Sequence, residues 1–317
     1  MWCDLTKSKR NQILGIILLV ITSLIWGGAF VAQNDAMNHI GPLTMNGIRT
    51  LLAAIFLFPV CMVSDVIQGK KPSMLGTNDK AHKKTILLGG LLCGIVITLA
   101  SGIQQIGIKY TSVGKAGFLT TLYVVFVPII ELFLGKRIKW NGWIGVALAM
   151  LGMFFICIIE TFTIELGDLL IILSAFFFAV HILIVDKYVG VAGMRLSPLQ
   201  FLICGVCCLA GALIFEEITW NAILQAMPAI LYAGIASAGI GYTLQIIAQK
   251  WVAPNIAPLV MCLESVFALL FGSILHHESM TAIEYIGCAL VFIAIVVAQI
   301  DFSSIKSSKA DNQSKED

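Results

Sequence analysis

Charged side chains are scarce in this sequence. Asp, Glu, Lys and Arg make up 12% of its 317 residues, whereas an average soluble protein has about 25%. Hydrophobic residues account for 59% of the chain, and its mean hydropathy is +0.94. This composition excludes an ordinary soluble domain, because so many apolar side chains could not be hidden from water in one interior.

The sequence also lacks the motifs of several enzyme classes. It has no G-x-x-x-x-G-K-[ST] phosphate loop, so we do not expect ATP to drive it directly. No Ser/His/Asp set, H-E-x-x-H motif or clustered carboxylate pair points to a membrane enzyme. The basic segments lie beside apolar runs, where they serve topology and lipid headgroups. We therefore expect no catalytic residues, no cofactor and no nucleic-acid partner.

The nine cysteines give no disulfide framework, since nearly all lie in or beside apolar segments. Cys204, Cys207 and Cys208 have a spacing that resembles a metal site, but no second Cys or His pair accompanies them. We interpret the cysteines as packing residues and expect no metal.

What the chain does have is ten long apolar stretches, most of them near the ~20 residues that cross a ~30 Å hydrocarbon layer. They cover 13–33, 42–63, 85–108, 113–134, 141–159, 167–185, 197–215, 226–249, 253–275 and 281–300. No alternating barrel pattern occurs, so the spans must be helices. The predicted fold class is an all-α polytopic membrane protein with ten transmembrane helices.

The distribution of Lys and Arg predicts the orientation. With the N-terminus inside the cell, all of these residues except Arg49, Lys109 and Lys115 fall on the cytoplasmic side. We expect a multi-pass protein of the plasma (inner) membrane with both termini cytoplasmic. The basic residues before the first apolar run do not form a cleaved signal, because that run is long and has no A-x-A-like site.

The second half of the sequence repeats the plan of the first. A shift of 141 positions superposes 104–137 on 245–278 without a gap, pairing Gln104 with Gln245 and Tyr123 with Glu264. Five spans per half make the repeats inverted, because the second half must enter the membrane from the opposite side. The expected segments are a cytoplasmic N-terminus (1–12), two repeats (13–160 and 161–302) and a disordered tail (303–317).

Inverted repeats favour a transporter, since two such halves can exchange conformations about a site near the midplane. The alternatives are a membrane enzyme or a scaffold in which the duplication only builds a stable bundle. Among transporters, a facilitator or exchanger is an alternative to proton-coupled transport. The cargo, its direction, the coupling ion and the oligomeric state are not specified by the sequence.

The chain resembles the drug/metabolite transporter superfamily of the EamA-domain type. The resemblance rests on Leu24–Phe30 in the first span, Gly117–Pro128 in the fourth, Leu263–Ala268 in the ninth, and Glu278. It implies ten helices in two repeats, a small-molecule substrate carried without ATP, and a cavity lined by the first, third, fourth, sixth, eighth and ninth helices. Ser265 replaces the proline that commonly follows Glu264 in the family, so we expect a straighter ninth helix.

Ionisable groups deep in a membrane are costly and are therefore functional candidates. Glu264 lies about halfway along its span, where a carboxyl group away from water favours its protonated form; it could couple protons or bind an amine. His181 is also near mid-depth, and Arg49 lies inside the second span, where it could meet an anionic group. Each has a structural alternative, as a packing residue or as an interhelical hydrogen-bonding partner. Glu131 is expected to pair with the cations that follow it.

Neutral side chains complete the predicted site. Gln104 and Gln245 occupy the third and eighth spans, Trp26 and Tyr123 would form apolar walls, and Tyr242 lies one turn before Gln245. For each of them alone, packing is an equal alternative. We expect a small polar or amphipathic molecule to bind among these residues by alternating access, with protons as a second partner and lipids around the bundle.

Overall fold

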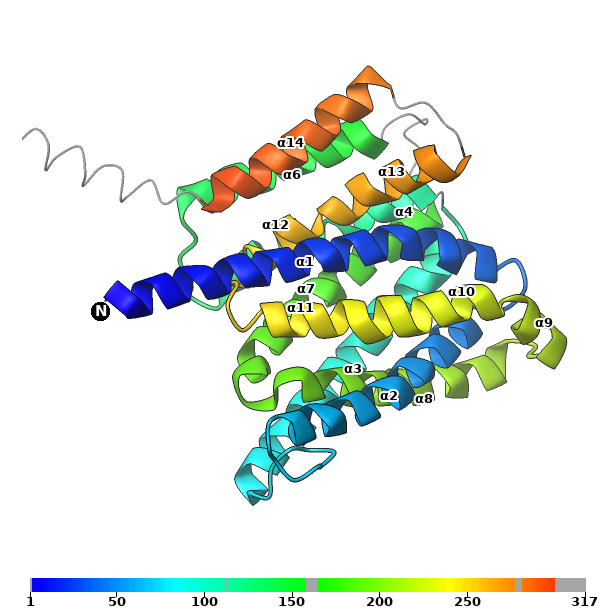
Figure 1. The fold of residues 1–317 in the computed structure, drawn as a ribbon. Coiled ribbons are helices and arrows are strands. Elements are labelled where there is room, and N and C mark those ends of the chain that lie inside the picture. The colour runs from blue at the N-terminus through cyan, green and yellow to red at the C-terminus, as the bar shows by residue number, and fades with distance from the viewer. Residues whose placement is uncertain (1, 112, 158–164, 277–280, 300–317) are drawn as a thin grey trace, which may run out of the picture.

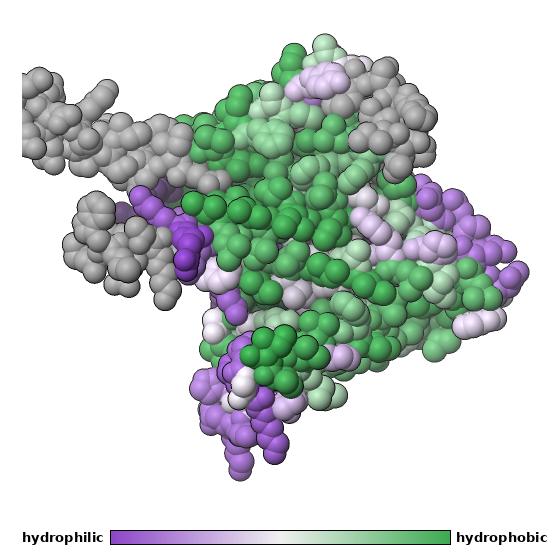
Figure 2. All heavy atoms as spheres, in the orientation of Figure 1, coloured by the Kyte–Doolittle hydropathy of each residue, from purple (hydrophilic) through white to green (hydrophobic). Residues whose placement is uncertain are grey.

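A computed structural model describes residues 2–111, 113–157, 165–276 and 281–299, and every regular element in these ranges is helical. The predicted all-α, polytopic class is confirmed. Figure 2 shows hydrophobic residues over the middle of the visible face and hydrophilic residues toward its two ends. Such a belt is what a bundle surrounded by lipid requires.

The first half of the chain forms six helices: α1 (Trp2–Ala36), α2 (Pro42–Ile67), α3 (Lys80–Ile108), α4 (Val113–Thr120), α5 (Tyr123–Phe133) and α6 (Trp140–Cys157). The second half begins with α7 (Leu166–Ala192), a 3₁₀ turn, η1 (Gly193–Arg195), α8 (Leu196–Phe215) and α9 (Trp220–Gln225). It continues with α10 (Met227–Leu231), the wide π-helix η2 (Tyr232–Gly241), α11 (Tyr242–Ala248), α12 (Ala257–Met261), α13 (Leu263–His276) and α14 (Ala282–Gln299).

Six helical stretches in the described ranges are long and apolar enough to cross a membrane, and three apolar helices are shorter. The predicted count of ten spans therefore stays a prediction. The predicted N-terminal segment is continuous with the first span, because α1 begins at Trp2. The predicted tail and Glu278 lie outside the described residues. In Figure 1 the start of α1 and the end of α14 lie at the same end of the bundle, here called the N-terminal end.

Contacts between the helices follow a two-fold pattern. The contact of α1 with α13 has its counterpart in that of α7 with α4 and α5. The contact of α3 with α7 corresponds to the contact of η2 and α11 with α1. The contact of α3 with α8 corresponds to that of η2 with α2. The pairs α2–α8 and α6–α14 are their own counterparts. Exchange of two equivalent halves would give this pattern, although the repeat boundaries remain predictions.

Two spans are interrupted at positions that the 141-residue shift makes equivalent. The fourth span breaks between α4 and α5, and the Val124 N–H donates to the Thr121 oxygen at 2.9 Å. The ninth breaks between α12 and α13, and the Ser265 N–H donates to the Cys262 oxygen at 3.2 Å. These are i→i+3 bonds, which tighten a helix locally. The ninth span has this tight turn without a proline at 265, and the straighter ninth helix expected from the sequence stays a prediction.

The antiparallel helices α2 and α8 are joined at both ends. At one end the Glu216 carboxylate accepts hydrogen bonds from the backbone N–H groups of Leu43 and Thr44, each at 2.8 Å. At the other, Arg195 Nη2 lies 2.5 Å from Asp65 Oδ1, and that carboxylate is buried. Carboxylates at a helix N-terminus satisfy N–H groups that have no partner within the helix.

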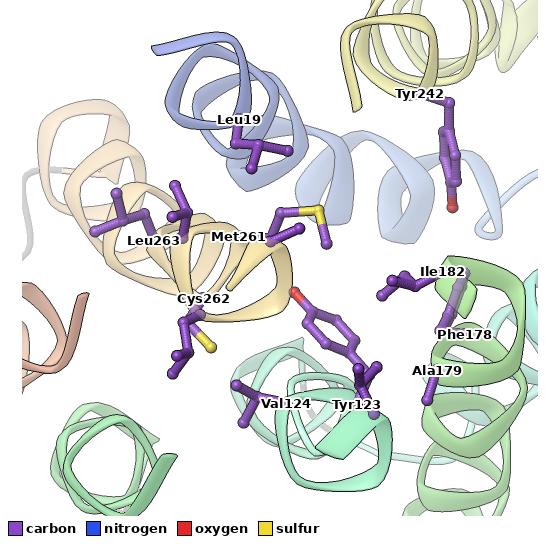
Figure 3. Packing of buried hydrophobic residues seen from close by; sticks show 14 of the residues in the cluster. Leu19, Tyr123, Val124, Phe178, Ala179, Ile182, Tyr242, Met261, Cys262 and Leu263 are labelled. Atoms are coloured by element: carbon purple, nitrogen blue, oxygen red, sulfur yellow. The ribbon is translucent and has the colours of Figure 1, made fainter. Parts of the chain in front are cut away.

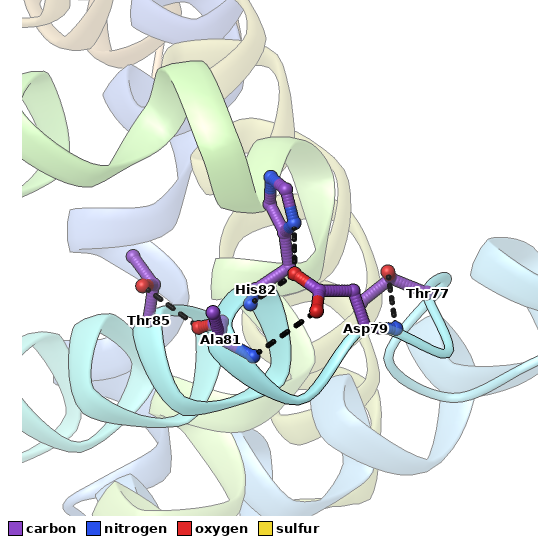
Figure 4. Close-up of polar contacts among 5 residues, drawn as sticks. All are labelled: Thr77, Asp79, Ala81, His82 and Thr85. Carbon is purple, nitrogen blue, oxygen red and sulfur yellow. Dashed lines mark hydrogen bonds and ion pairs between the residues drawn. The ribbon is translucent and has the colours of Figure 1, made fainter.

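Helix α3 begins with a capping residue at the N-terminal end of the bundle. Asp79 accepts a hydrogen bond from the His82 backbone N–H at 3.0 Å, and its Oδ2 lies 2.6 Å from His82 Nδ1 (Figure 4). The backbone hydrogen bond from His82 holds the pKa of Asp79 below its usual value. The sequence Thr77–Lys80 thus fixes the start of α3 through an ordinary N-cap.

Candidate functional site

A cavity lies between the two halves of the bundle. All eight residues predicted for the site line it: Trp26, Arg49, Gln104, Tyr123, His181, Tyr242, Gln245 and Glu264. Eight further residues complete the lining: Ala29, Phe30, Gln33, Thr120, Phe178, Ile182, Ser237 and Met261. The structure therefore brings every predicted site residue together, while the role of each stays a prediction.

The cavity extends from the middle of the bundle toward the end opposite the N-terminal end. Gln33 and Gln104 mark this opposite end, because they lie in the last turns of α1 and α3. His181 lies near the middle of α7, and Glu264 follows the break in the ninth span. Buried apolar residues such as Leu19 and Val127 occupy the bundle on the N-terminal side.

Glu264 and Tyr123 form the central contact of the cavity. The Tyr123 hydroxyl donates to Glu264 Oε1 at 3.2 Å, and each residue is 3% exposed. Figure 3 shows Tyr123 reaching from α5 toward the α12–α13 segment beside Met261. The two residues are 141 positions apart, which is the shift that aligns the two halves. Equivalent residues of the two halves therefore touch each other here.

Arg49 is the cation that lines the cavity. Its Nε donates to Asn46 Oδ1 at 3.0 Å, and the side chain is 4% exposed. Asn46 is held in turn by its amide group, which donates to Ser101 Oγ at 2.9 Å. Within the described ranges no carboxylate pairs with Arg49. The guanidinium thus lies at the cavity without a carboxylate partner in the part of the chain that the structure describes.

His181 is oriented by a residue of α8. Its Nε2 lies 2.8 Å from Gln200 Oε1, and both side chains are buried. With the amide in this orientation the ring donates from Nε2, so Nδ1 is the hydrogen-bond acceptor. The imidazole ring also meets the Tyr242 ring edge to face, with centroids 6.1 Å apart. Gln200 therefore holds the imidazole ring of His181 between α8 and the Tyr242 ring.

Two glutamine oxygens of the lining have no partner among the described residues. Gln33 donates to the Ala29 oxygen at 2.9 Å and Gln245 donates to Gln249 at 3.4 Å, but Oε1 of both Gln33 and Gln245 is buried and unpaired. By contrast, Gln104 donates to Thr120 Oγ1 at 3.0 Å. An unpaired buried acceptor costs roughly 1–3 kcal/mol, which a donor from a bound molecule would offset.

Aromatic rings form one wall of the cavity. The rings of Trp26 and Tyr242 lie 4.6 Å apart, and Phe201 meets Tyr242 edge to face at 5.3 Å. The indole Nε1 of Trp26 donates to the Ser237 oxygen at 3.3 Å, which fixes α1 against η2. Trp26 and Tyr242 thus give the cavity an aromatic surface, and Phe201 supports Tyr242 from behind the lining.

Several lining or supporting residues were not predicted from the sequence: Gln33, Asn46, Thr120, Gln200 and Ser237. One signal was available for Asn46, which lies three residues before Arg49 on the same helix face. Gln200 is a polar residue within an apolar run, which also marks it as a candidate for an interhelical hydrogen bond.

Glu131 has the structural role that was expected of it. Lys136 Nζ lies 2.9 Å from Glu131 Oε1 and 3.8 Å from Asp186 Oδ2. The hydrogen bond to Glu131 raises the pKa of Lys136 above its usual value. This cluster is not part of the cavity lining. No group of three or more His, Cys, Asp or Glu residues in the described ranges is arranged to hold a metal ion.

Comparison with known proteins identifies the family of this chain and shows several similar transporters. The model of the EamA-like transporter family matches residues 13–158 and 165–299. An uncharacterized transporter of Archaeoglobus fulgidus is 25% identical over 89% of this chain and 84% of its own length. The uncharacterized transporter YoaV of Bacillus subtilis is 25% identical over 91% and 97%. The uncharacterized inner membrane transporter YedA of Escherichia coli is 22% identical over 87% and 88%.

A solved structure has the same fold. It superposes on this chain with a TM-score of 0.73 at 15% identity and covers 90% of this chain and 96% of its own. At this identity the likeness concerns the fold alone.

Proposed function

Because the chain belongs to the EamA-like transporter family, matched over residues 13–158 and 165–299, we propose that it carries a small polar or amphipathic molecule through the cavity by alternating access. The observation that carries this proposal is the convergence of helices from both halves on one space between them. At its centre the Tyr123–Glu264 hydrogen bond joins equivalent positions of the two halves. Transport sites of inverted-repeat proteins lie at such an interface.

Glu264 is the proposed coupling residue. An ionised carboxylate is costly in a low-dielectric interior. Among the described residues, buried Glu264 has Tyr123 as a hydrogen-bond partner and no cation. Proton loss is therefore favoured only when water or a charged cargo reaches the cavity. Protonation of Glu264 is then linked to the conformation, which is the requirement for proton-coupled transport. In this mechanism both termini face the cytoplasm and residues 13–160 and 161–302 act as the two moving repeats.

The test is transport by the purified protein in lipid vesicles. A thermal-shift screen over amino acids, nucleobases and cationic drugs first identifies a cargo, and its flux is then followed with and without a pH gradient. We expect Glu264→Gln to abolish flux driven by the pH gradient, because an amide cannot exchange a proton. The matched control is Glu131→Gln, which alters a buried carboxylate outside the cavity and should retain gradient-driven flux.

Two results would decide against proton coupling through Glu264. Unchanged flux with unchanged pH dependence in Glu264→Gln would refute it. If the wild-type protein exchanges cargo across the vesicle membrane but a pH gradient never changes the flux, the protein is instead a facilitator or exchanger with the same fold.

A further inference from the structure

We propose that the cargo carries a carboxylate and that Arg49 binds it. This inference rests on the proposed transport function, which it extends to a substrate class. Its basis is the unpaired guanidinium at the cavity, together with the polar and apolar groups that surround it.

A buried charge is costly unless an opposite charge or hydrogen-bond acceptors surround it. Arg49 is 4% exposed and uses one N–H donor on Asn46, while the other donors have no protein acceptor within the described ranges. The carboxyl group of the same cavity, Glu264, accepts its hydrogen bond from Tyr123. Since the cost of burying a charge falls when an opposite charge is bound, an anionic group is the ligand that this position favours.

The geometry of arginine narrows the anion to a planar group. A guanidinium presents parallel N–H donors that match the two oxygens of a carboxylate. Asn46 fixes Nε of Arg49 at 3.0 Å and is itself fixed by Ser101, so the terminal N–H groups are preoriented. A preorganised donor pair binds with less loss of side-chain freedom than a mobile one.

The rest of the lining describes the other end of the cargo. The unpaired oxygens of Gln33 and Gln245 require N–H or O–H donors, and the Trp26–Tyr242 wall requires an apolar surface. Amino- and hydroxycarboxylates with an apolar side chain combine these three properties. A purely cationic or purely apolar molecule would leave Arg49 without a counterion.

The experiment compares each acid with its own primary amide on the purified full-length protein in detergent. The probes are the proteinogenic amino acids, lactate, 4-methylpentanoate and 3-phenylpropionate, with dissociation constants taken from thermal shift and calorimetry. We expect acids to bind about 10- to 100-fold more tightly than their amides, which corresponds to the loss of one charged hydrogen-bonded contact. Equal affinity for the members of each pair, or no thermal shift with any carboxylate, would overturn the proposal.

Variants then assign the preference to Arg49. Arg49→Gln should remove the preference for acids over amides, and Arg49→Lys should retain a part of it, because charge remains without the planar fork. The matched control is Arg195→Gln, which removes a guanidinium from the ion pair with Asp65 outside the cavity. That control should lower the thermal midpoint and leave the preference unchanged. A full preference in Arg49→Gln contradicts the assignment.

The outcome separates this inference from the transport proposal. A preference for acids in solution without any flux in vesicles would support Arg49 and refute transport. Flux of a cargo without a carboxylate, abolished by Glu264→Gln, would support transport and refute the role of Arg49.

Discussion

Replacement of Gly27 by alanine should separate α1 from α13 at the level of the cavity. A Cβ atom at Gly27 would lie 2.8 Å from the Ala268 nitrogen, 2.8 Å from Phe267 Cβ and 2.9 Å from the Glu264 oxygen, whereas ordinary contacts are 3.4–4 Å. These neighbours are backbone atoms or the first side-chain atom, so no rotamer change can relieve the overlap. The two helices must move apart.

The expected loss follows from two opposing effects. Overpacking a well-packed interface costs about 1–3 kcal/mol, and this site falls toward the upper end because three contacts are too short at once. Alanine in place of glycine in a helix returns up to about 1 kcal/mol. We therefore expect Gly27→Ala to reduce the free energy of unfolding by about 1–2 kcal/mol.

The assay is reversible denaturant unfolding in detergent micelles, followed by tryptophan fluorescence. The control is Gly102→Ala on α3, where an added Cβ would meet nothing within 4 Å. It should be neutral or stabilising by up to about 1 kcal/mol. If the two variants unfold alike, backbone contact at Gly27 does not limit the approach of α1 and α13.

Two further predictions concern helix ends. Glu216→Ala removes the acceptor for the first N–H groups of α2 and should lower the free energy of unfolding by about 1–3 kcal/mol, measured in the same assay; an unchanged midpoint would show that water replaces the carboxylate. Asp79→Ala should speed amide hydrogen exchange at Ala81 and His82, whereas Asp79→Asn should retain protection, because asparagine also caps helices. The pKa of Asp79 is lowered in the folded protein, so the cap contributes fully above the usual aspartate range and is lost as the pH falls through the lowered value. Protection that persists in Asp79→Ala would contradict a capping role.

Residues that line the cavity could be named from the sequence more accurately than the bounds of the helices that carry them. Depth within an apolar run identifies Glu264, His181 and Arg49 because a charge there needs a special environment, and the repeat then points to Tyr123. Hydropathy reports the hydrocarbon-spanning part of a helix only. The apolar run therefore predicted a start at residue 13. The helix α1 begins earlier, at Trp2, because backbone hydrogen bonding continues beyond the apolar run.

What could not be predicted depends on pairs of distant residues. The sequence does not show which residues Gln200 and Asn46 contact. The packing of α8 on α7 brings Gln200 to His181, and the turn of α2 brings Asn46 to Arg49. The contact of Glu216 with the start of α2 requires two helix ends to meet. The break at Cys262 coincides with a tight backbone hydrogen bond from the Ser265 N–H to the Cys262 oxygen, four residues after Pro258.

The π-helix η2 determines which way the side chains of α11, the next part of the eighth span, face around the helix axis. The Tyr242 N–H bonds to the Ser237 oxygen, five residues back, and the same oxygen accepts the indole N–H of Trp26. Each residue by which the register changes on conversion of this stretch to an α-helix would turn the following residues by about 100° around the helix axis. Tyr242 and Gln245 would then turn together, so the register of η2 determines which side chains of α11 face the cavity that Trp26 of α1 also lines.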